Sequence, residues 1–388
     1  MDFGMTEHDW KLRTLVADAV LDTRVQEALD AVVADSAPEP DVRALYRELG
    51  RHRLLAPHWP VEYGGLGTSH TGAATIVTDL FAAGVPDMQQ VLSVQIVGAF
   101  LLTAGSDEQK RRYLPAMAAG ERFATVLYTE PEVGSDLASL QTTAVRDGDD
   151  YLLSGVKVYG LKSGMSDLAL CAVRTGAEAG RYDGITLFLI DLTADGVTRS
   201  NLPTMADEQF DRVELDRVRV GPETMVGAEG DGWPLLLQCL ALERTGLDYS
   251  LRARRWYETT LAGIDPDETD SALLADIGRY GVHVETASLM TSSVLSRMDR
   301  QVTDEVMAAM AKYVTSETAQ QVAVWATEVH GLGYGLRSLS REDIAVLEAG
   351  YREAAGVTLA AGTSQIMLEI VSGSIAAAGS TQEAWPWT

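Results

Sequence analysis

The stretch Tyr128-Thr129-Glu130-Pro131-Glu132-Val133-Gly134-Ser135-Asp136 stands where a helix-like part of the chain gives way to a strand-like part. Its threonine, glycine and serine can supply hydroxyl and backbone N–H donors to a flavin or a phosphate from a loop that enters a β-domain. An ordinary capped loop uses the same residue types. The stretch by itself therefore leaves a ligand-binding loop and a structural loop as alternatives.

The parts on either side of this stretch have different periodicities. Between Thr6 and Arg122 apolar residues recur at helical spacing, with breaks at Gly64–Gly67 and Gly105–Ser106. Beyond the stretch, the runs 151–158, 168–173 and 185–190 predict short strands separated by Asp-Gly turns. After residue 231 steps of three and four return, as from Ile277 to Val294, and predict helices almost to the end.

Strands clustered between two helical blocks predict an α+β fold of segregated layers, because βαβ alternation is absent. We expect three domains. They are an N-terminal helical domain at 1–122, a middle β-domain at 123–231 and a C-terminal helical bundle at 232–388.

Composition excludes several classes of function. The 388 residues contain 31 Lys plus Arg against 56 Asp plus Glu, a formal charge of -25, which opposes binding to nucleic acid or to an anionic membrane surface. The two cysteines, Cys171 and Cys239, have no metal-ligand or disulfide spacing, so we expect no metal site and a reducing compartment. No stretch reaches the roughly 20 apolar residues of a spanning helix, and we expect a soluble, cytoplasmic protein.

Five segments, in order along the chain, resemble motifs of the acyl-CoA dehydrogenase family. Thr129–Asp136 is similar to its flavin-binding signature Thr-Glu-Pro-x-x-Gly-Ser-Asp. The other four segments are 59–67, 105–115, 330–335 and 362–366. Any one of them is a weak signal, whereas five in register are strong. The resemblance implies a helical domain, a β-domain and a C-terminal four-helix bundle, in agreement with the periodicities.

The resemblance also implies a reaction, FAD-dependent α,β-dehydrogenation of an acyl thioester. In that reaction a carboxylate removes the α-proton and the β-hydrogen leaves as hydride to flavin N5. The implied partners are an acyl-CoA or acyl-carrier-protein substrate, an electron-transferring flavoprotein, and further copies or a related subunit in an oligomer.

The family has two placements for the base. The commoner one corresponds to Ala361 here, so that base is missing. The other is a Glu directly before an Arg on the first long helix of the C-terminal domain, and Glu243-Arg244 corresponds to it. The resemblance therefore implies that Glu243 is the catalytic base. The structural alternative is a helix-surface Glu paired with one of the arginines at 252–255.

The resemblance further implies which residues contact cofactor and substrate. The implied cofactor contacts are Tyr128, Thr129, Gly134, Ser135, Tyr159, Leu161, Gly331, Thr363 and Gln365. Ser135 and Arg244 are the implied substrate contacts. Leu161 departs from the family pattern, because a threonine hydroxyl near flavin N5 is usual at that position.

The contacts that a subunit normally donates to its neighbour's FAD are also altered. An acidic turn at 265–270 and Glu328 stand where the family has an Arg and a Gln near the pyrophosphate. A carboxylate there disfavours phosphate binding. This pattern resembles that of actinobacterial two-subunit acyl-CoA dehydrogenases and favours the base-carrying subunit of a heteromer. The alternatives are a noncatalytic, flavin-poor subunit and a flavin oxidase or monooxygenase on the same fold.

Overall fold

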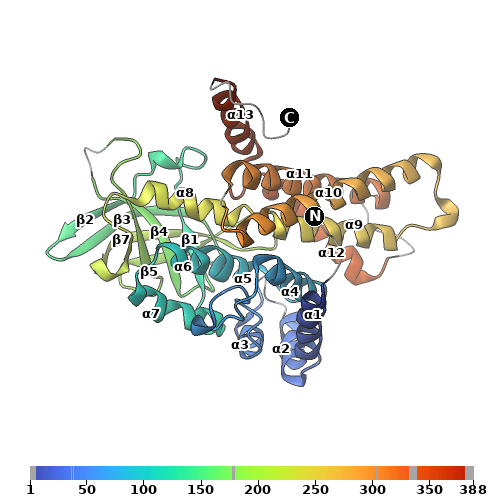
Figure 1. Cartoon of the computed structure of the whole chain (residues 1–388), viewed down its shortest axis with the longest axis horizontal. Helices are drawn as coiled ribbons and strands as arrows, with labels where there is room; N and C mark the ends of the chain where they lie inside the picture. The colour runs from blue at the N-terminus through green and yellow to red at the C-terminus, as the bar shows by residue number, and fades with distance from the viewer. Residues whose placement is uncertain are drawn as a thin grey trace. The chain divides into compact units, whose positions relative to one another are not determined.

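The computed structural model describes residues 6–35, 37, 39–176, 180–302, 304–331 and 339–380 (Figure 1). It divides into two compact units, each described here by itself. Unit 1 is Met1–Thr204 with Glu208–Leu242, and unit 2 is Met205–Asp207 with Glu243–Thr388.

Unit 1 begins with helices, as the apolar spacing predicts. They are α1 (Glu7–Val20), α2 (Thr23–Ala34), α3 (Arg43–Arg51), α4 (His70–Ala82), α5 (Met88–Gln90), a π-helical segment (Val91–Gly98), α6 (Ala99–Ala104) and α7 (Asp107–Ala118). The predicted break at Gly105–Ser106 is confirmed. Ser106 caps α7 by accepting the N–H of Gln109, whose side chain in turn accepts the N–H of Ser106.

The strands of unit 1 form one mixed sheet. They are β1 (Ala124–Leu127), β2 (Thr143–Asp147), β3 (Asp150–Leu161), β4 (Leu168–Arg174), β5 (Ile185–Asp191), β6 (Val197–Leu202), β7 (Phe210–Val220) and β8 (Met225–Val226). Their order is β6-β7-β3-β2-β4-β5-β8, and β1 pairs with β4 in parallel. The three strand-like runs of the sequence correspond to β3, β4 and β5, which confirms the predicted β region.

The apolar run in β4 reflects burial on both faces of the sheet. Leu168, Leu170 and Ala172 pack in a core shared with the helices of unit 1, whereas Ala169 and Cys171 pack in a second core with residues of β5 and β7. Because successive side chains of a strand point to opposite faces, a strand covered on both sides reads as continuously apolar.

Unit 2 is helical. Helix α8 (Gly232–Glu243) leads into it, and α9 (Leu247–Ala262), α10 (Ser271–Asp299), α11 (Glu305–His330), α12 (Arg341–Val357) and α13 (Ser364–Ser380) follow. Helices α9 to α12 lie alongside one another around Trp256, Val284 and Leu347, and α13 contacts α11 (Figure 1).

The α+β fold class is confirmed by these elements, while the three domain boundaries stay a prediction. Within the described ranges, no helix combines the length and the apolar character needed to cross a membrane.

Candidate active site

The loop after β1 is held through its backbone. The carbonyl of Tyr128 accepts a hydrogen bond from Lys157 Nζ at 3.0 Å, and the carbonyl of Thr129 accepts the N–H of Val158 at 2.9 Å. The Tyr128 phenol is buried and donates to Cys239 Sγ at 3.2 Å. The Tyr128 hydroxyl and carbonyl therefore both have partners within the chain.

The next residues of this loop are open to solvent. Gly134 and Ser135 are exposed, and a Cβ placed on Gly134 would meet no atom of the chain within 4 Å. Packing inside the chain therefore does not require glycine at position 134. Glycine also occurs where a bound group must come close to the backbone. That explanation fits Gly134, because its loop offers N–H and hydroxyl donors.

A β-bulge in β3 positions the second segment predicted to contact the cofactor. The register against β7 shifts between Lys157 and Gly160, and Tyr159 adopts a left-handed φ of 56°. Its side chain is 61% exposed and makes an edge contact with Phe210, with ring centroids 6.3 Å apart. Bulges of this kind re-aim side chains beside active sites. Leu161 is only partly exposed, and its carbonyl accepts the hydroxyl of Thr125 at 2.6 Å.

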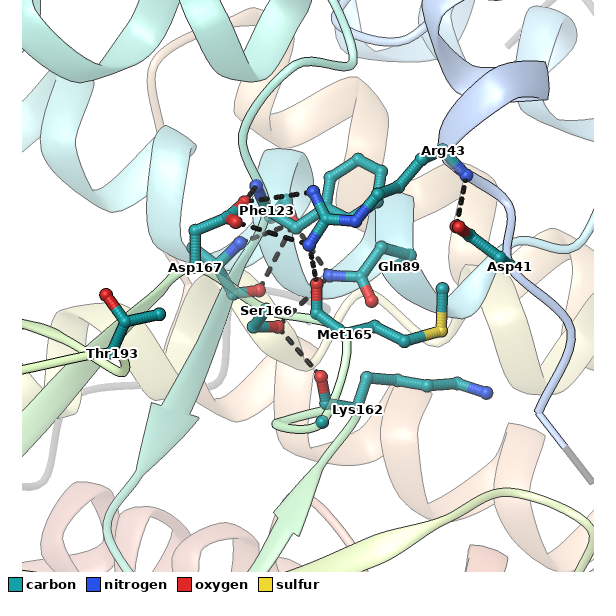
Figure 2. A network of polar contacts seen from close by, with 12 residues as sticks. Asp41, Arg43, Gln89, Phe123, Lys162, Met165, Ser166, Asp167 and Thr193 are labelled. Atoms are coloured by element: carbon teal, nitrogen blue, oxygen red, sulfur yellow. Dashed lines mark hydrogen bonds and ion pairs between the residues drawn. The ribbon is translucent and has the colours of Figure 1, made fainter. Parts of the chain in front are cut away.

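The segment between β3 and β4 is held by a polar network (Figure 2). Arg43 of α3 pairs with Asp167 at 3.2 Å and donates to the carbonyl of Met165 at 2.5 Å. From α5, Gln89 donates to the hydroxyl of Ser166 at 3.2 Å. These contacts fix the chain that directly follows the bulged end of β3.

The exposed groups of the two segments fit a flavin cofactor. An exposed aromatic ring at Tyr159 offers a face for a planar ring, and the open backbone at Gly134 with the Ser135 hydroxyl offers donors for a phosphate. Among the described residues, no cluster of three or more His, Cys, Asp or Glu side chains is arranged to hold a metal ion.

In unit 2, Glu243 lies at the end of a helix and not within a long one. It is the last residue of α8, and α9 begins only at Leu247 after a break at Gly246. Gly246 has φ of 77°, and a Cβ there would lie 2.8 Å from Thr315 Oγ1 of α11. The expectation that Glu243 and Arg244 lie within one long helix is therefore wrong. The helix is interrupted because Gly246 adopts a left-handed conformation and packs against α11.

Two charged groups in this part of unit 2 have shifted pKa values. Burial raises the pKa of Glu243 and the charge of Arg244 lowers it; burial is the larger effect, and the pKa is about 7. On α11, Lys312 is 0% exposed, and burial lowers its pKa to about 8, against Asp248, which raises it. The Lys312 ammonium donates to the carbonyl of Val357 at 3.3 Å. A carboxyl group with a pKa near neutrality is suited to act as a general base.

Arg244 reaches the position of the missing common base. Its Nε donates to the carbonyl of Ala361 at 3.0 Å, and a Cβ on Gly362 would lie 3.1 Å from its Nη2. Arg254 pairs with Glu258 and Glu285, and Arg252 lies 3.7 Å from Glu353. These pairs give Arg252 and Arg254 carboxylate partners other than Glu243.

The remaining predicted contacts lie at helix ends of unit 2. Thr363 Oγ1 accepts the N–H of Ile366 at 3.2 Å at the start of α13, and Gln365 is exposed. Gly331 has φ of 75° and ends α11. The rest of its motif, 332–335, lies outside the described residues. His330 is buried and donates from Nε2 to the carbonyl of Thr260 at 3.0 Å, so it has a structural role.

Sequence profiles of the three acyl-CoA dehydrogenase domains match most of the chain. The N-terminal domain matches residues 6–121, the middle domain residues 125–218 and the C-terminal domain residues 230–376. The chain belongs to the acyl-CoA dehydrogenase family. Members of this family are flavin oxidoreductases that act on CH–CH bonds.

Individual acyl-CoA dehydrogenases are similar to this chain over more than half of its length or over nearly all of it. Acyl-CoA dehydrogenase FadE29 of Mycobacterium tuberculosis is 32% identical over 347 residues, which are 86% of this chain and 88% of that protein. Acyl-CoA dehydrogenase FadE26 of the same organism is 35% identical over 240 residues, 61% of this chain and 59% of FadE26. The structure of butyryl-CoA dehydrogenase from Megasphaera elsdenii superposes with a TM-score of 0.82 at 20% identity, covering 97% of this chain and 100% of that one. The resemblance inferred from five motifs is thus confirmed.

The acidic turn that departs from the acyl-CoA dehydrogenase pattern has a local structural role. Asp265 accepts the N–H of Asp267 at 2.9 Å, and Asp270 caps α10 by accepting the N–H of Leu273 at 2.8 Å. Carboxylates at these positions satisfy N–H groups that a helix start leaves unpaired. Glu328 is exposed on α11.

The sequence interpretation missed two buried lysines. Lys157 is 0% exposed in β3 and pairs with Glu130 at 2.8 Å, and Lys312 is equally buried in α11. The available signal was a charged residue inside an apolar run, at 151–158 for Lys157. Its partner was not predictable, because the pairing depends on how the loop after β1 meets β3.

Proposed function

We propose that this chain catalyses FAD-dependent α,β-dehydrogenation of an acyl thioester, with Glu243 as the base. The observation that carries the proposal is that Glu243 stands directly before Arg244 at the less common base position, with Arg244 bonded to the carbonyl of Ala361. The pKa of Glu243, raised by burial to about 7, supports it. The commoner position holds Ala361, which cannot accept a proton.

The neighbours of Glu243 keep it able to ionise. Buried carboxyl groups without a cation remain protonated well above neutral pH, whereas Arg244 lowers this pKa. A base must be ionised before it removes the substrate's α-proton, and it is most effective when its pKa is close to the working pH. Arg244 itself is held in place by the carbonyl of Ala361.

The proposed cofactor contacts follow from the resemblance to the family and fall, in each unit separately, in the two segments of unit 1 and at helix ends of unit 2. The segments supply Tyr128, Thr129, Gly134, Ser135, Tyr159 and Leu161, and the helix ends supply Gly331, Thr363 and Gln365. When bound, FAD supplies the acceptor for the β-hydrogen, which leaves as hydride to N5. Because Leu161 has no hydroxyl, its backbone N–H is the donor that this position offers.

The proposed substrate is an acyl group carried by coenzyme A or by a carrier protein, with Ser135 and Arg244 as contacts. The proposed electron acceptor is an electron-transferring flavoprotein. We place the chain in an oligomer with a related acyl-CoA dehydrogenase subunit, because the acidic turn at 265–270 and Glu328 put negative charge where a neighbour's pyrophosphate would need a cation.

The first test is the visible absorption spectrum of the purified chain, alone and after co-expression with a related subunit. Acyl-CoA thioesters are then added without oxygen, and loss of the oxidised-flavin band is followed. A band that appears with the partner and bleaches on addition of substrate supports the proposal. A full band in the chain alone contradicts the heteromer, and absence of flavin from both preparations would leave a noncatalytic subunit. Oxygen consumption in place of acceptor-dependent turnover would identify an oxidase.

A further inference from the structure

A buried ion pair connects strand β3 of unit 1 with the loop after β1. Lys157 Nζ lies 2.8 Å from Glu130 Oε1, and the two side chains are 0% and 6% exposed. Lys157 comes from β3, directly before the β-bulge, and Glu130 comes from the loop after β1. The pair therefore joins the two segments that the proposed function assigns to the flavin.

Each partner also holds backbone groups. Lys157 donates to the carbonyl of Tyr128 at 3.0 Å. Glu130 accepts the N–H of Gln141 at 2.6 Å and the N–H of Thr142 at 2.8 Å. The two charges thus fix both ends of the loop 128–142, which contains the exposed Gly134 and Ser135.

The pair also bears on the geometry of the bulge. Val158 donates its N–H to the carbonyl of Thr129 at 2.9 Å, so the residues directly after Lys157 are bonded to the same loop. Tyr159 follows with its left-handed φ and exposed ring. A shift of Lys157 would therefore move the Thr129 backbone and the Tyr159 ring together.

Stability alone is a poor explanation for such a pair. The free energy lost when two charges are taken out of water is about as large as the free energy gained from their attraction. Replacing a buried ion pair with apolar groups is therefore often neutral for stability. Burial works to raise the pKa of Glu130, yet the charge of Lys157 and the hydrogen bonds to the carboxylate lower it below its ordinary value. Glu130 thus stays ionised and keeps its bonds to the loop at neutral pH.

We propose that Lys157 and Glu130 are positioning residues for the flavin, which hold the loop 128–142 and the bulged end of β3 in register for the cofactor. This inference rests on the proposed function, because it takes these segments as the flavin contacts.

The test compares FAD binding by wild type and Lys157→Met in the full chain, with its partner subunit if flavin requires it. Met keeps the length of the side chain, and Glu130 retains its two backbone donors. Loss of the charge-assisted bonds is expected to weaken FAD binding on the order of tenfold or more. At saturating FAD, the visible circular dichroism of the bound flavin is expected to change, which a loss of stability alone would not produce.

Two further variants separate positioning from folding. The double variant Lys157→Met with Glu130→Gln removes both charges and is expected to fold, yet to keep the weak FAD binding and altered spectrum. Leu49→Ala, in the helical core of unit 1, is expected to lower the melting temperature with unchanged FAD affinity and spectrum.

The outcomes distinguish this inference from the proposed function. Wild-type affinity and spectrum in Lys157→Met and in the double variant would overturn the positioning role while leaving the flavin enzyme intact. Absence of FAD binding by wild type, alone and with its partner, would overturn both.

Discussion

Replacing Glu243 with Gln removes a titrating group while keeping the shape of the side chain. The pKa of Glu243 is about 7 in the folded chain, against an ordinary value of 4.5 for a glutamate side chain. Because the folded pKa is the higher one, the protonated carboxyl stabilises the fold fully below pH 4.5. That contribution is lost as the pH rises through about 7.

The size of this effect follows from the two pKa values. A separation of roughly 2.5 units corresponds to about 3 kcal/mol of unfolding free energy. Between pH 4.5 and 8, wild type is expected to lose about 3 kcal/mol relative to Glu243→Gln. Urea titrations of both proteins at the two pH values measure the difference.

Under the proposed mechanism, ionisation of Glu243 raises the catalytic rate, although the same ionisation lowers the free energy of unfolding. The ionised base is the active form, so kcat/KM of wild type is expected to rise with pH through an apparent pKa near 7. Glu243→Gln is expected to lose a factor of about 10² to 10⁴ in flavin reduction by the acyl thioester, because general-base catalysis is worth that much.

Glu258→Gln is the matched control, since Glu258 is an exposed residue of α9 whose ion pair with Arg254 spans 3.6 Å. It is expected to retain wild-type rates and wild-type pH dependence. Unchanged flavin reduction in Glu243→Gln would refute the assignment of the base. A wild-type rate profile without a transition near neutral pH would refute the environment assigned to Glu243.

Three other substitutions test the Arg244 charge, the Gly246 turn and the Arg43 ion pair. Arg244→Met removes the charge that lowers the pKa of Glu243, so the kinetic pKa is expected to rise; an unchanged pH profile would contradict this coupling. Gly246→Ala places a Cβ 2.8 Å from Thr315 Oγ1 in a left-handed backbone conformation, so it is expected to lower the free energy of unfolding by roughly 2 kcal/mol or more. An unchanged melting temperature would contradict this. Arg43→Met removes the ion pair with Asp167 and is expected to cost about 1 to 2 kcal/mol in urea unfolding, whereas no loss would mean that the network in Figure 2 adds little stability.

The fold was predictable because its signals are local. Apolar spacing indicated the helices on both sides of the β region, and the runs at 151–158, 168–173 and 185–190 became β3, β4 and β5. Ser106 could be recognised as a helix start because its capping partner is only three residues away. Such interactions depend on neighbours in sequence, which a single chain displays directly.

The site was less predictable because its interactions join distant residues. Nothing near Glu130 indicates that Lys157, 27 positions later, would pair with it in a buried site. The acidic turn at 265–270 was interpreted from its charge, whereas Asp265 caps a short 3₁₀ helix and Asp270 caps the long helix α10. The left-handed Gly246, which lies between α8 and α9, was also not anticipated, because one glycine within helical spacing is often tolerated.

The charges around Glu243 connect the choice of base with its environment. The charges of Arg244 and Lys312 lower the pKa of Glu243, whereas that of Asp248 raises it. Glu317 also acts on Lys312, and Glu305 also acts on Arg244. The two cations therefore favour the ionised form of Glu243, which is the form that can remove a proton. Arg244 donates to the backbone carbonyl of Ala361, and the alanine side chain offers no carboxylate to compete for the charge of Arg244. With alanine at position 361, the charge of Arg244 acts on Glu243, and this arrangement is consistent with the proposed role of Glu243 in proton removal.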